Sequence, residues 1–121
     1  MTRQADNKRL NAEKRGRRAE LFAAIALQLK GYRIRARRFK TKAGEVDLIA
    51  QKGDLIVLVE VKARPTLMQA HEAISHTSGN RIAAAGDIWL SQQRGAARLS
   101  IRHDLIAVLP RRWPIHVPNA F

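Results

Sequence analysis

The chain contains no cysteine, few aromatic residues and no hydrophobic run long enough to cross a membrane. The absence of cysteine excludes disulfides, thiolate metal sites and a cysteine nucleophile. Aromatic residues make up only 5% of the sequence, which gives little support to recognition of single strands by base stacking. No glycine-rich phosphate-binding loop is present, which argues against nucleoside triphosphate chemistry. The alanine-rich stretch after the basic leader lacks a small-residue cleavage site, so we expect no signal peptide, no membrane partner and a cytoplasmic protein.

Acidic residues are also scarce, because 23 Lys and Arg stand against 10 Asp and Glu, for a formal net charge of +13. The cations are concentrated in residues 1–42, with 14 Lys and Arg against three acids, whereas residues 43–121 hold nine against seven. A basic face of this kind concentrates phosphates and binds them in a salt-dependent manner. We therefore favour nucleic acid as the partner over a basic surface that serves only solubility.

The length and the hydrophobic content predict one folded domain, since 121 residues with 45% hydrophobic side chains can bury a single core. Residues 1–15 are polar and without period, which predicts a basic flexible N-terminal arm or a frayed helix start before an α/β domain over residues 16–121. Helical spacing begins at about Arg17 and ends near Gly31. Alternation from Tyr32 then predicts a half-buried strand near a sheet edge.

The clearest element is a hairpin of strands over residues 45–51 and 54–63, with its turn at residues 51–54. Helical spacing resumes at Thr66 and is interrupted at residues 78–80, which predicts either a kinked helix or two helices. A strand over residues 99–109 follows, and residues 115–117 suggest a last edge strand. The sequence therefore predicts a single α/β domain, with a mixed β-sheet flanked by helices in the order α-β-β-β-α-β.

Charged side chains occur inside this apolar hairpin, where an ionised group needs a partner. In a regular hairpin, Glu45 and Asp47 share one face of the first strand, and Glu60 and Lys62 share one face of the second. A two- or four-residue turn pairs Asp47 with an even-numbered residue, which is Leu58 if the turn is Lys52-Gly53. All four charged groups then lie on the same side of the sheet, whereas an odd turn or a bulge would separate them.

Carboxylates placed together repel each other, by about 4 kcal/mol for unit charges 4 Å apart at an effective dielectric constant of 20. A hard cation such as Mg²⁺ relieves this repulsion, because it prefers oxygen ligands and retains waters beside a substrate phosphate. Lys62 could hold or polarise a water bound to that metal. These residues suit phosphodiester hydrolysis. The alternative is that Lys62 simply pairs with Glu60 or Asp47 and that no metal binds.

Two motifs, Gly44-Glu45-x-Asp47-Leu48-Ile49 and Val59-Glu60-Val61-Lys62-x-Arg64, occur together with Gly31-Tyr32 and a terminal Asn119-Ala120-Phe121. In combination they resemble the YraN family of predicted endonucleases. That family is similar to the restriction-endonuclease-like, PD-(D/E)xK superfamily, close to archaeal Holliday-junction resolvases. The resemblance runs from about Gly16 to the C-terminus and implies the same α-β-β-β-α-β core.

The resemblance also implies roles for individual residues. Asp47 and Glu60 resemble the ligands of Mg²⁺ or Mn²⁺, Lys62 resembles the catalytic lysine, and Glu20 resembles a further acidic member of the site, with Glu45 as another candidate. Relatives usually carry a basic residue near positions 78–80, where this chain retains only the following arginine. The candidate nucleic-acid contacts are Arg33, Arg35, Arg37, Arg38, Lys40, Lys42, Arg64 and Arg81.

The leading hypothesis is a metal-dependent nuclease that acts on DNA rather than RNA, with branched or structured DNA as a candidate substrate. The alternatives are a non-catalytic nucleic-acid-binding module and a scaffold in a repair or processing complex. A homodimer is expected by analogy with resolvases, which cut two strands. The four scattered histidines are interpreted as surface or satisfied residues and Trp89 as core. Asp104 is interpreted as a strand-end residue in preference to an acid that supports the site residues.

Overall fold

The computed structural model describes residues 2–121 and contains nine helices and strands in the predicted order. In chain order they are α1 (Arg3–Leu29), β1 (Arg33–Lys40), β2 (Glu45–Lys52), β3 (Leu55–Ala63), α2 (Leu67–Glu72), α3 (His76–Ser91), the 3-10 helix η1 (Ala96–Arg98), β4 (Ser100–Val108) and β5 (Ile115–Val117). The predicted single α/β domain is confirmed, and it fits a restriction-endonuclease-like fold.

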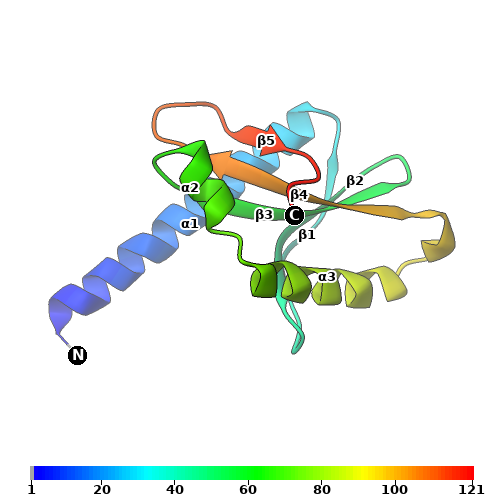
Figure 1. The fold of residues 1–121 in the computed structure, drawn as a ribbon, viewed down its shortest axis with the longest axis horizontal. Coiled ribbons are helices and arrows are strands. Elements are labelled where there is room, and N and C mark those ends of the chain that lie inside the picture. Colours follow the sequence, from blue (N-terminus) through cyan, green and yellow to red (C-terminus); the bar gives the residue numbers. More distant parts are fainter. Residues whose placement is uncertain (1) are drawn as a thin grey trace.

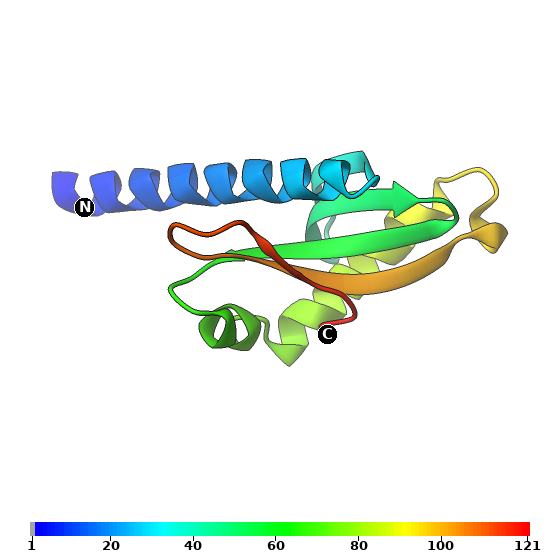
Figure 2. The same cartoon turned by 90° about the horizontal axis from the view of Figure 1, so that it is seen from above.

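The strands form one mixed sheet in the order β1-β2-β3-β4-β5 (Figure 1). The β3–β4 pair is parallel and the other three pairs are antiparallel. Helix α1 covers one face of the sheet and α2 and α3 cover the other, which gives three layers (Figure 2). The predictions of an edge position for β1 and of a last edge strand at residues 115–117 are confirmed.

The close packing of α3 on the sheet depends on glycine at two positions. A Cβ atom at Gly86 would lie 2.2 Å from Cδ1 of Leu58, so α3 approaches β3 more closely than a larger residue would allow. A Cβ atom at Gly44 would lie 2.2 Å from the carbonyl oxygen of Arg81. The glycine of the Gly44-Glu45 motif therefore lets the β1–β2 turn pack against the backbone of α3, which fixes the start of β2.

The β2–β3 hairpin turns at Gly53 and Asp54, and the φ of Gly53 is +61°. Its paired positions run from Lys52 opposite Leu55 to Leu48 opposite Val59. The two-residue turn confirms the predicted pairing of odd with even residues. However, the turn lies one residue later than Lys52-Gly53, so the next position in this register places Glu60, rather than Leu58, opposite Asp47.

Two helix boundaries differ from the sequence predictions. Residues 3–15 are helical, so of the two predicted alternatives the described part of this segment forms a helix start, and the helix begins at Arg3 rather than near Arg17. Thr2 accepts a hydrogen bond from the amide of Ala5 at 3.3 Å and caps the longer helix. The flexibility of the segment stays a prediction, and Met1 lies outside the described residues.

The second difference concerns the region between β3 and β4. The structure contains two helices, one of the two predicted alternatives, but residues 78–80 lie inside α3 rather than in the break. The break falls at residues 73–75, because Ser75 caps α3 and its hydroxyl accepts a hydrogen bond from the amide of Ser78 at 3.0 Å. Among residues 2–121, no helix combines the length and the apolar character that a membrane span requires.

Candidate active site

The regular β2–β3 pairing ends just before Asp47, and the side chain of Asp47 lies at this end. Leu48 packs in the core beneath α1, but Val46 packs in the core beneath α3, although alternate residues of a regular strand share one face. The alternation is therefore broken at Asp47. Its Oδ2 accepts a hydrogen bond from the amide of Val61 at 2.8 Å. The carboxylate therefore takes the place of a main-chain carbonyl at the point where the β2–β3 pairing ends.

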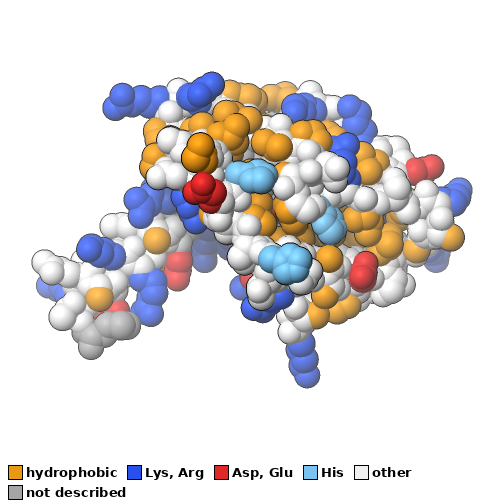
Figure 3. Space-filling view, in the orientation of Figure 1, with side chains coloured by type: hydrophobic (Ala, Val, Ile, Leu, Met, Phe, Trp, Pro, Cys, Tyr) orange, Lys and Arg blue, Asp and Glu red, His pale blue; other side chains and the backbone are white. Residues whose placement is uncertain are grey.

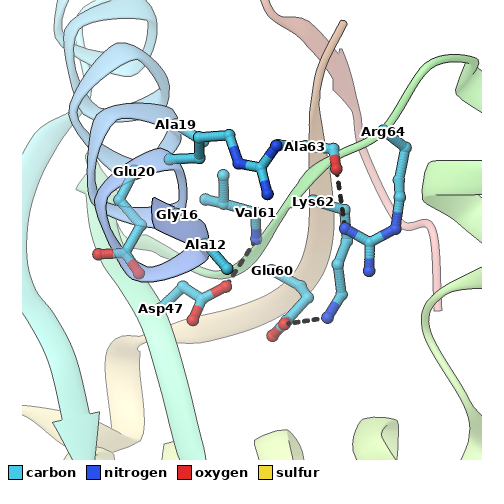
Figure 4. Close-up of a pocket in the computed structure, with 11 residues that line it drawn as sticks. Ala12, Gly16, Ala19, Glu20, Asp47, Glu60, Val61, Lys62, Ala63 and Arg64 are labelled. Carbon is cyan, nitrogen blue, oxygen red and sulfur yellow. Dashed lines mark hydrogen bonds and ion pairs between the residues drawn. The ribbon is translucent and has the colours of Figure 1, made fainter. Parts of the chain in front are cut away.

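Three of the predicted site residues, Asp47, Glu60 and Lys62, line one cavity of about 440 Å³ (Figure 4). The Nζ of Lys62 lies 3.2 Å from Oε1 of Glu60. Glu20 reaches the same cavity from α1, so four of the five predicted catalytic candidates come together. The remaining lining residues are Ala12, Arg15, Gly16 and Ala19 of α1 and Val61, Ala63 and Arg64 of β3 and the residue after it.

The carboxylates in this cavity are crowded. Burial, and after it the negative charges of Glu60 and Glu20, raise the pKa of Asp47 from its usual 3.8 to about 7, although the hydrogen bond from the Val61 amide acts in the opposite direction. The side chain of Glu60 is only 13% exposed and its one ion pair among the described residues is with Lys62. Among the ion pairs of the described residues none includes Asp47, so a proton or a cation would relieve the repulsion that this carboxylate experiences.

Glu20 is held by a single arginine from an unusual backbone position. The Nε of Arg38 lies 2.7 Å from Oε2 of Glu20, and this pair raises the pKa of Arg38, with smaller effects from Glu45 and Asp47. The φ of Arg38 is +51°, in the left-handed region, which costs on the order of 1 kcal/mol for a residue other than glycine. Arg38, predicted to contact nucleic acid, is thus directed towards the acidic residues of the site.

The fifth catalytic candidate, Glu45, does not line the cavity of Asp47. Glu45 is exposed and lies in a neighbouring groove, which it shares with Glu20, Arg38 and Lys40. The expectation that Glu45 joins the other three charged groups fails because the alternation of β2 is broken at Asp47. Glu20 lines both hollows and so connects them.

The donor set of the cavity fits a hard cation that retains water. Asp47 and Glu60 offer carboxylate oxygens from adjacent strands, and their mutual repulsion is what a divalent cation would relieve. Within residues 2–121, no group of three or more His, Cys, Asp or Glu side chains is placed to hold a metal ion. Two protein carboxylates together with a substrate phosphate and waters are the usual surroundings of Mg²⁺ in phosphate chemistry.

The predicted nucleic-acid contacts are distributed over several surfaces. Arg64 lines the cavity itself, and Lys40 lines the neighbouring groove. Arg33 and Arg35 instead bind Gln51, and the guanidinium of Arg35 lies 5.2 Å from the ring centroid of the buried core residue Trp89. The remaining three, Arg37, Lys42 and Arg81, are exposed and do not line the cavity.

Arg15 lines the cavity but was not among the predicted site residues. Its only signal in the sequence is its place in a basic run, because a segment interpreted as irregular gives no side-chain direction. Once residues 3–18 are helical, Arg15 follows Ala12 and precedes Ala19 at the spacing of one helix face. The helical conformation thus places a cation beside the carboxylates.

A second buried carboxylate, Asp104, forms a separate cluster. It is a fully buried residue in the middle of β4 rather than at a strand end, so that interpretation was wrong. Asp104 accepts hydrogen bonds from Arg102 at 2.7 and 2.8 Å, from Nε2 of His116 at 2.6 Å and from the amide of Asn119 at 3.0 Å. Although burial opposes ionisation, these donors hold the pKa of Asp104 below its usual range.

This cluster explains part of the sequence resemblance outside the hairpin. Arg102 donates a third hydrogen bond, to the hydroxyl of Tyr32, at 3.1 Å. Tyr32 and Asn119, far apart in sequence, thus both bond to the Arg102–Asp104 pair. These bonds connect the residue before β1, β4 and the C-terminal segment, and neither Tyr32 nor Asn119 lines the candidate active site.

Comparison with known proteins identifies relatives along nearly the whole chain. A model of the uncharacterised protein family UPF0102 matches residues 19–108. A UPF0102 protein of Chelativorans sp. is 62% identical over 113 residues, which cover 93% of this chain and 91% of the relative. UPF0102 proteins of Mesorhizobium japonicum and Rhizobium meliloti are 63% and 53% identical, over 93% and 96% of this chain and 90% and 95% of their own lengths. The chain therefore belongs to the UPF0102 family, the YraN family that its motifs resemble.

Proposed function

We propose that this protein is a metal-dependent nuclease that hydrolyses phosphodiester bonds in DNA, with branched or structured DNA as the candidate substrate. The observation that carries the proposal is the convergence of Asp47, Glu60 and Lys62 in one cavity. Carboxylates repel phosphates, so their concentration in a protein with a net charge of +13 would weaken nucleic-acid binding unless a cation intervenes. A site of this composition is therefore better suited to cleavage than to binding alone.

The residues of the cavity divide into ligands and groups that stabilise charge. Asp47 and Glu60 would hold Mg²⁺ or Mn²⁺, and the ion, when bound, would supply Lewis-acid chemistry. The Lys62 ammonium can donate hydrogen bonds to a phosphate oxygen and stabilise the charge that develops there. Arg15 and Arg64, at the margin of the cavity, can hold the phosphates on either side of the reacting one.

The alternative of a non-catalytic binding module has one observation in its favour. Lys62 pairs with Glu60 at 3.2 Å, which is the interaction expected if the lysine has only a structural role. In a nuclease this pair would rearrange when substrate and metal enter, because Lys62 must then reach the phosphate. The two readings differ in what Lys62 contributes to the reaction.

The test is cleavage of linear duplex, single-stranded and four-way-junction DNA, and of RNA, with Mg²⁺ or Mn²⁺. Asp47→Asn and Lys62→Ala should lower the cleavage rate by at least a hundredfold, whereas Asp54→Asn, in the exposed β2–β3 turn, should leave it unchanged. Highly purified wild type with no more activity than Asp47→Asn on every substrate would refute the nuclease. DNA binding that persists in both variants and falls with salt would then support the binding module.

A further inference from the structure

The first half of α1 is a helix without a core to cover. Within residues 3–18, which we call the projecting half of α1, the N-terminal end extends beyond the sheet (Figures 1 and 2), whereas Ala12, Arg15 and Gly16 line the cavity of Asp47. The buried residues of α1 begin only at Ala19 and continue to Leu27. At 1.5 Å per residue, the part before Ala19 is about 24 Å long. Packing against the sheet therefore explains only the second half of this helix.

The projecting half carries an unbalanced positive charge. Residues 3–18 contain seven Lys and Arg against two acids. Among the described residues, the only ion pair in this segment joins Arg9 to Asp6 at 3.4 Å. The N-terminal end of a helix already carries partial positive charge, and neighbouring cations on a helix repel each other. Figure 3 shows Lys and Arg side chains around this projecting part. A bound polyanion would offset both the repulsion between these cations and their unfavourable position at the N-terminal end of the helix.

Part of this charge forms a continuous path to the candidate active site. Lys8, Asn11, Arg15 and Arg18 follow one another at spacings of three or four residues and line one groove along α1, which we call the α1 strip. Arg15 also lines the cavity of Asp47. The strip therefore begins at the candidate active site and extends towards the free end of the helix.

We propose that the α1 strip binds the phosphates of a DNA duplex that extends from the candidate active site along the projecting helix. This inference rests on the proposed function, because it assigns the strip to the substrate of that site. The strip from Lys8 to Arg18 spans about 15 Å, or about four base pairs at 3.4 Å each, and the whole projecting half spans about seven. Such contacts position a duplex without reading its sequence.

The test measures duplex binding with EDTA present, so that it does not depend on cleavage. The variant Lys8→Gln/Arg18→Gln removes two cations of the strip and leaves the cavity residues in place. The matched control, Arg94→Gln/Arg98→Gln, removes two exposed cations around η1 and changes the net charge equally. Glutamine has nearly the helix propensity of lysine and arginine, so α1 should remain folded, which circular dichroism checks.

The loss of two phosphate contacts should make the negative slope of the log binding constant against log salt shallower by about 1.8. It should also weaken binding about 60-fold at 0.1 M salt. The control should change affinity less than threefold. A folded strip variant with the slope and affinity of the control would overturn the inference and leave the nuclease proposal standing. Wild type that binds no duplex at low salt would also overturn it. Duplex binding that depends on the strip, in a protein that cleaves nothing, supports the inference and refutes only the nuclease.

Discussion

Replacing Asp47 by asparagine should stabilise the metal-free protein at alkaline pH. The substitution removes the charge that Glu60 and Glu20 repel, while the amide oxygen can still accept the hydrogen bond from Val61. A residue of a structural ion pair would behave in the opposite way, since its loss destabilises the fold. The sign of this effect therefore separates a carboxylate held under repulsion from one that holds the fold together.

The magnitude follows from the pKa of Asp47, which rises from 3.8 to about 7 in the folded protein. Each unit corresponds to 1.36 kcal/mol, so the full shift is equivalent to about 4 kcal/mol. Because Asp47 remains partly exposed and Glu60 can take up the proton in its place, we expect a gain of roughly 1–3 kcal/mol for Asp47→Asn at pH 8. The folded state binds the proton more tightly than the unfolded state. The stabilisation that the wild type gains from the proton on Asp47 is therefore fully present below pH 4 and is lost as the pH rises through 7.

The assay is urea unfolding at pH 4, 6 and 8 in EDTA, followed by circular dichroism, with Asp54→Asn as the exposed control. The difference between Asp47→Asn and wild type should be near zero at pH 4 and should grow with pH. A gain that is equal at all three pH values, or a loss at pH 8, would refute the electrostatic explanation. Added Mg²⁺ should raise the stability of wild type at pH 8 and should have less effect on Asp47→Asn, because only the carboxylate can hold the ion.

Three further predictions concern residues outside the carboxylate pair. Gly44→Ala should lower the free energy of unfolding by at least about 2 kcal/mol, because its Cβ would collide with the α3 backbone, and thermal unfolding measures this loss. Gly16→Ala, whose Cβ would meet no atom within 4 Å, should instead raise helix stability by about 0.5–1 kcal/mol; an equal loss in both variants would contradict the contact geometry. Asp104→Asn should cost about 3 kcal/mol at pH 7, since Arg102 and His116 lose their shared carboxylate. The pKa of Asp104 is lowered, so its stabilisation is present above pH 4 and is lost as the pH falls further; acid unfolding that Asp104→Asn leaves unchanged would refute this.

The fold could be predicted because its elements carry strong local patterns. The β2–β3 hairpin combines alternation, an apolar strand and a glycine in its turn, so the pairing of odd with even residues follows from turn length alone. The first half of α1 could not be predicted from periodicity, because a projecting helix buries no face and so shows no apolar spacing. Its signal is instead a capping threonine and a run of charges, which an irregular arm could also contain.

The main acidic and basic members of the candidate site could be predicted from the sequence, but Arg15 and the geometry of the site could not. Asp47, Glu60 and Lys62 were placed on one side of the sheet by parity, and the structure does bring them together. The direction of the Asp47 side chain depends on where the β2–β3 pairing ends, and that is set by tertiary packing around Val46 and Leu48. The same limit applies to Asp104, whose partners come from segments distant in sequence.

The two inward-facing aspartates of the sheet show how structure distinguishes a structural carboxylate from a reactive one. A carboxylate can accept about four hydrogen bonds. Asp104 accepts four, from Arg102, His116 and Asn119, which use its capacity and lower its pKa. Among the hydrogen bonds of the described residues, Asp47 accepts one, from a backbone amide, and its pKa is raised. Its remaining acceptor sites face a cavity that it shares with Glu60, so a proton, water or a cation must fill them. A structural role would not require acceptor sites that no protein donor fills. These unfilled acceptor sites are therefore the property that most favours a metal site at Asp47.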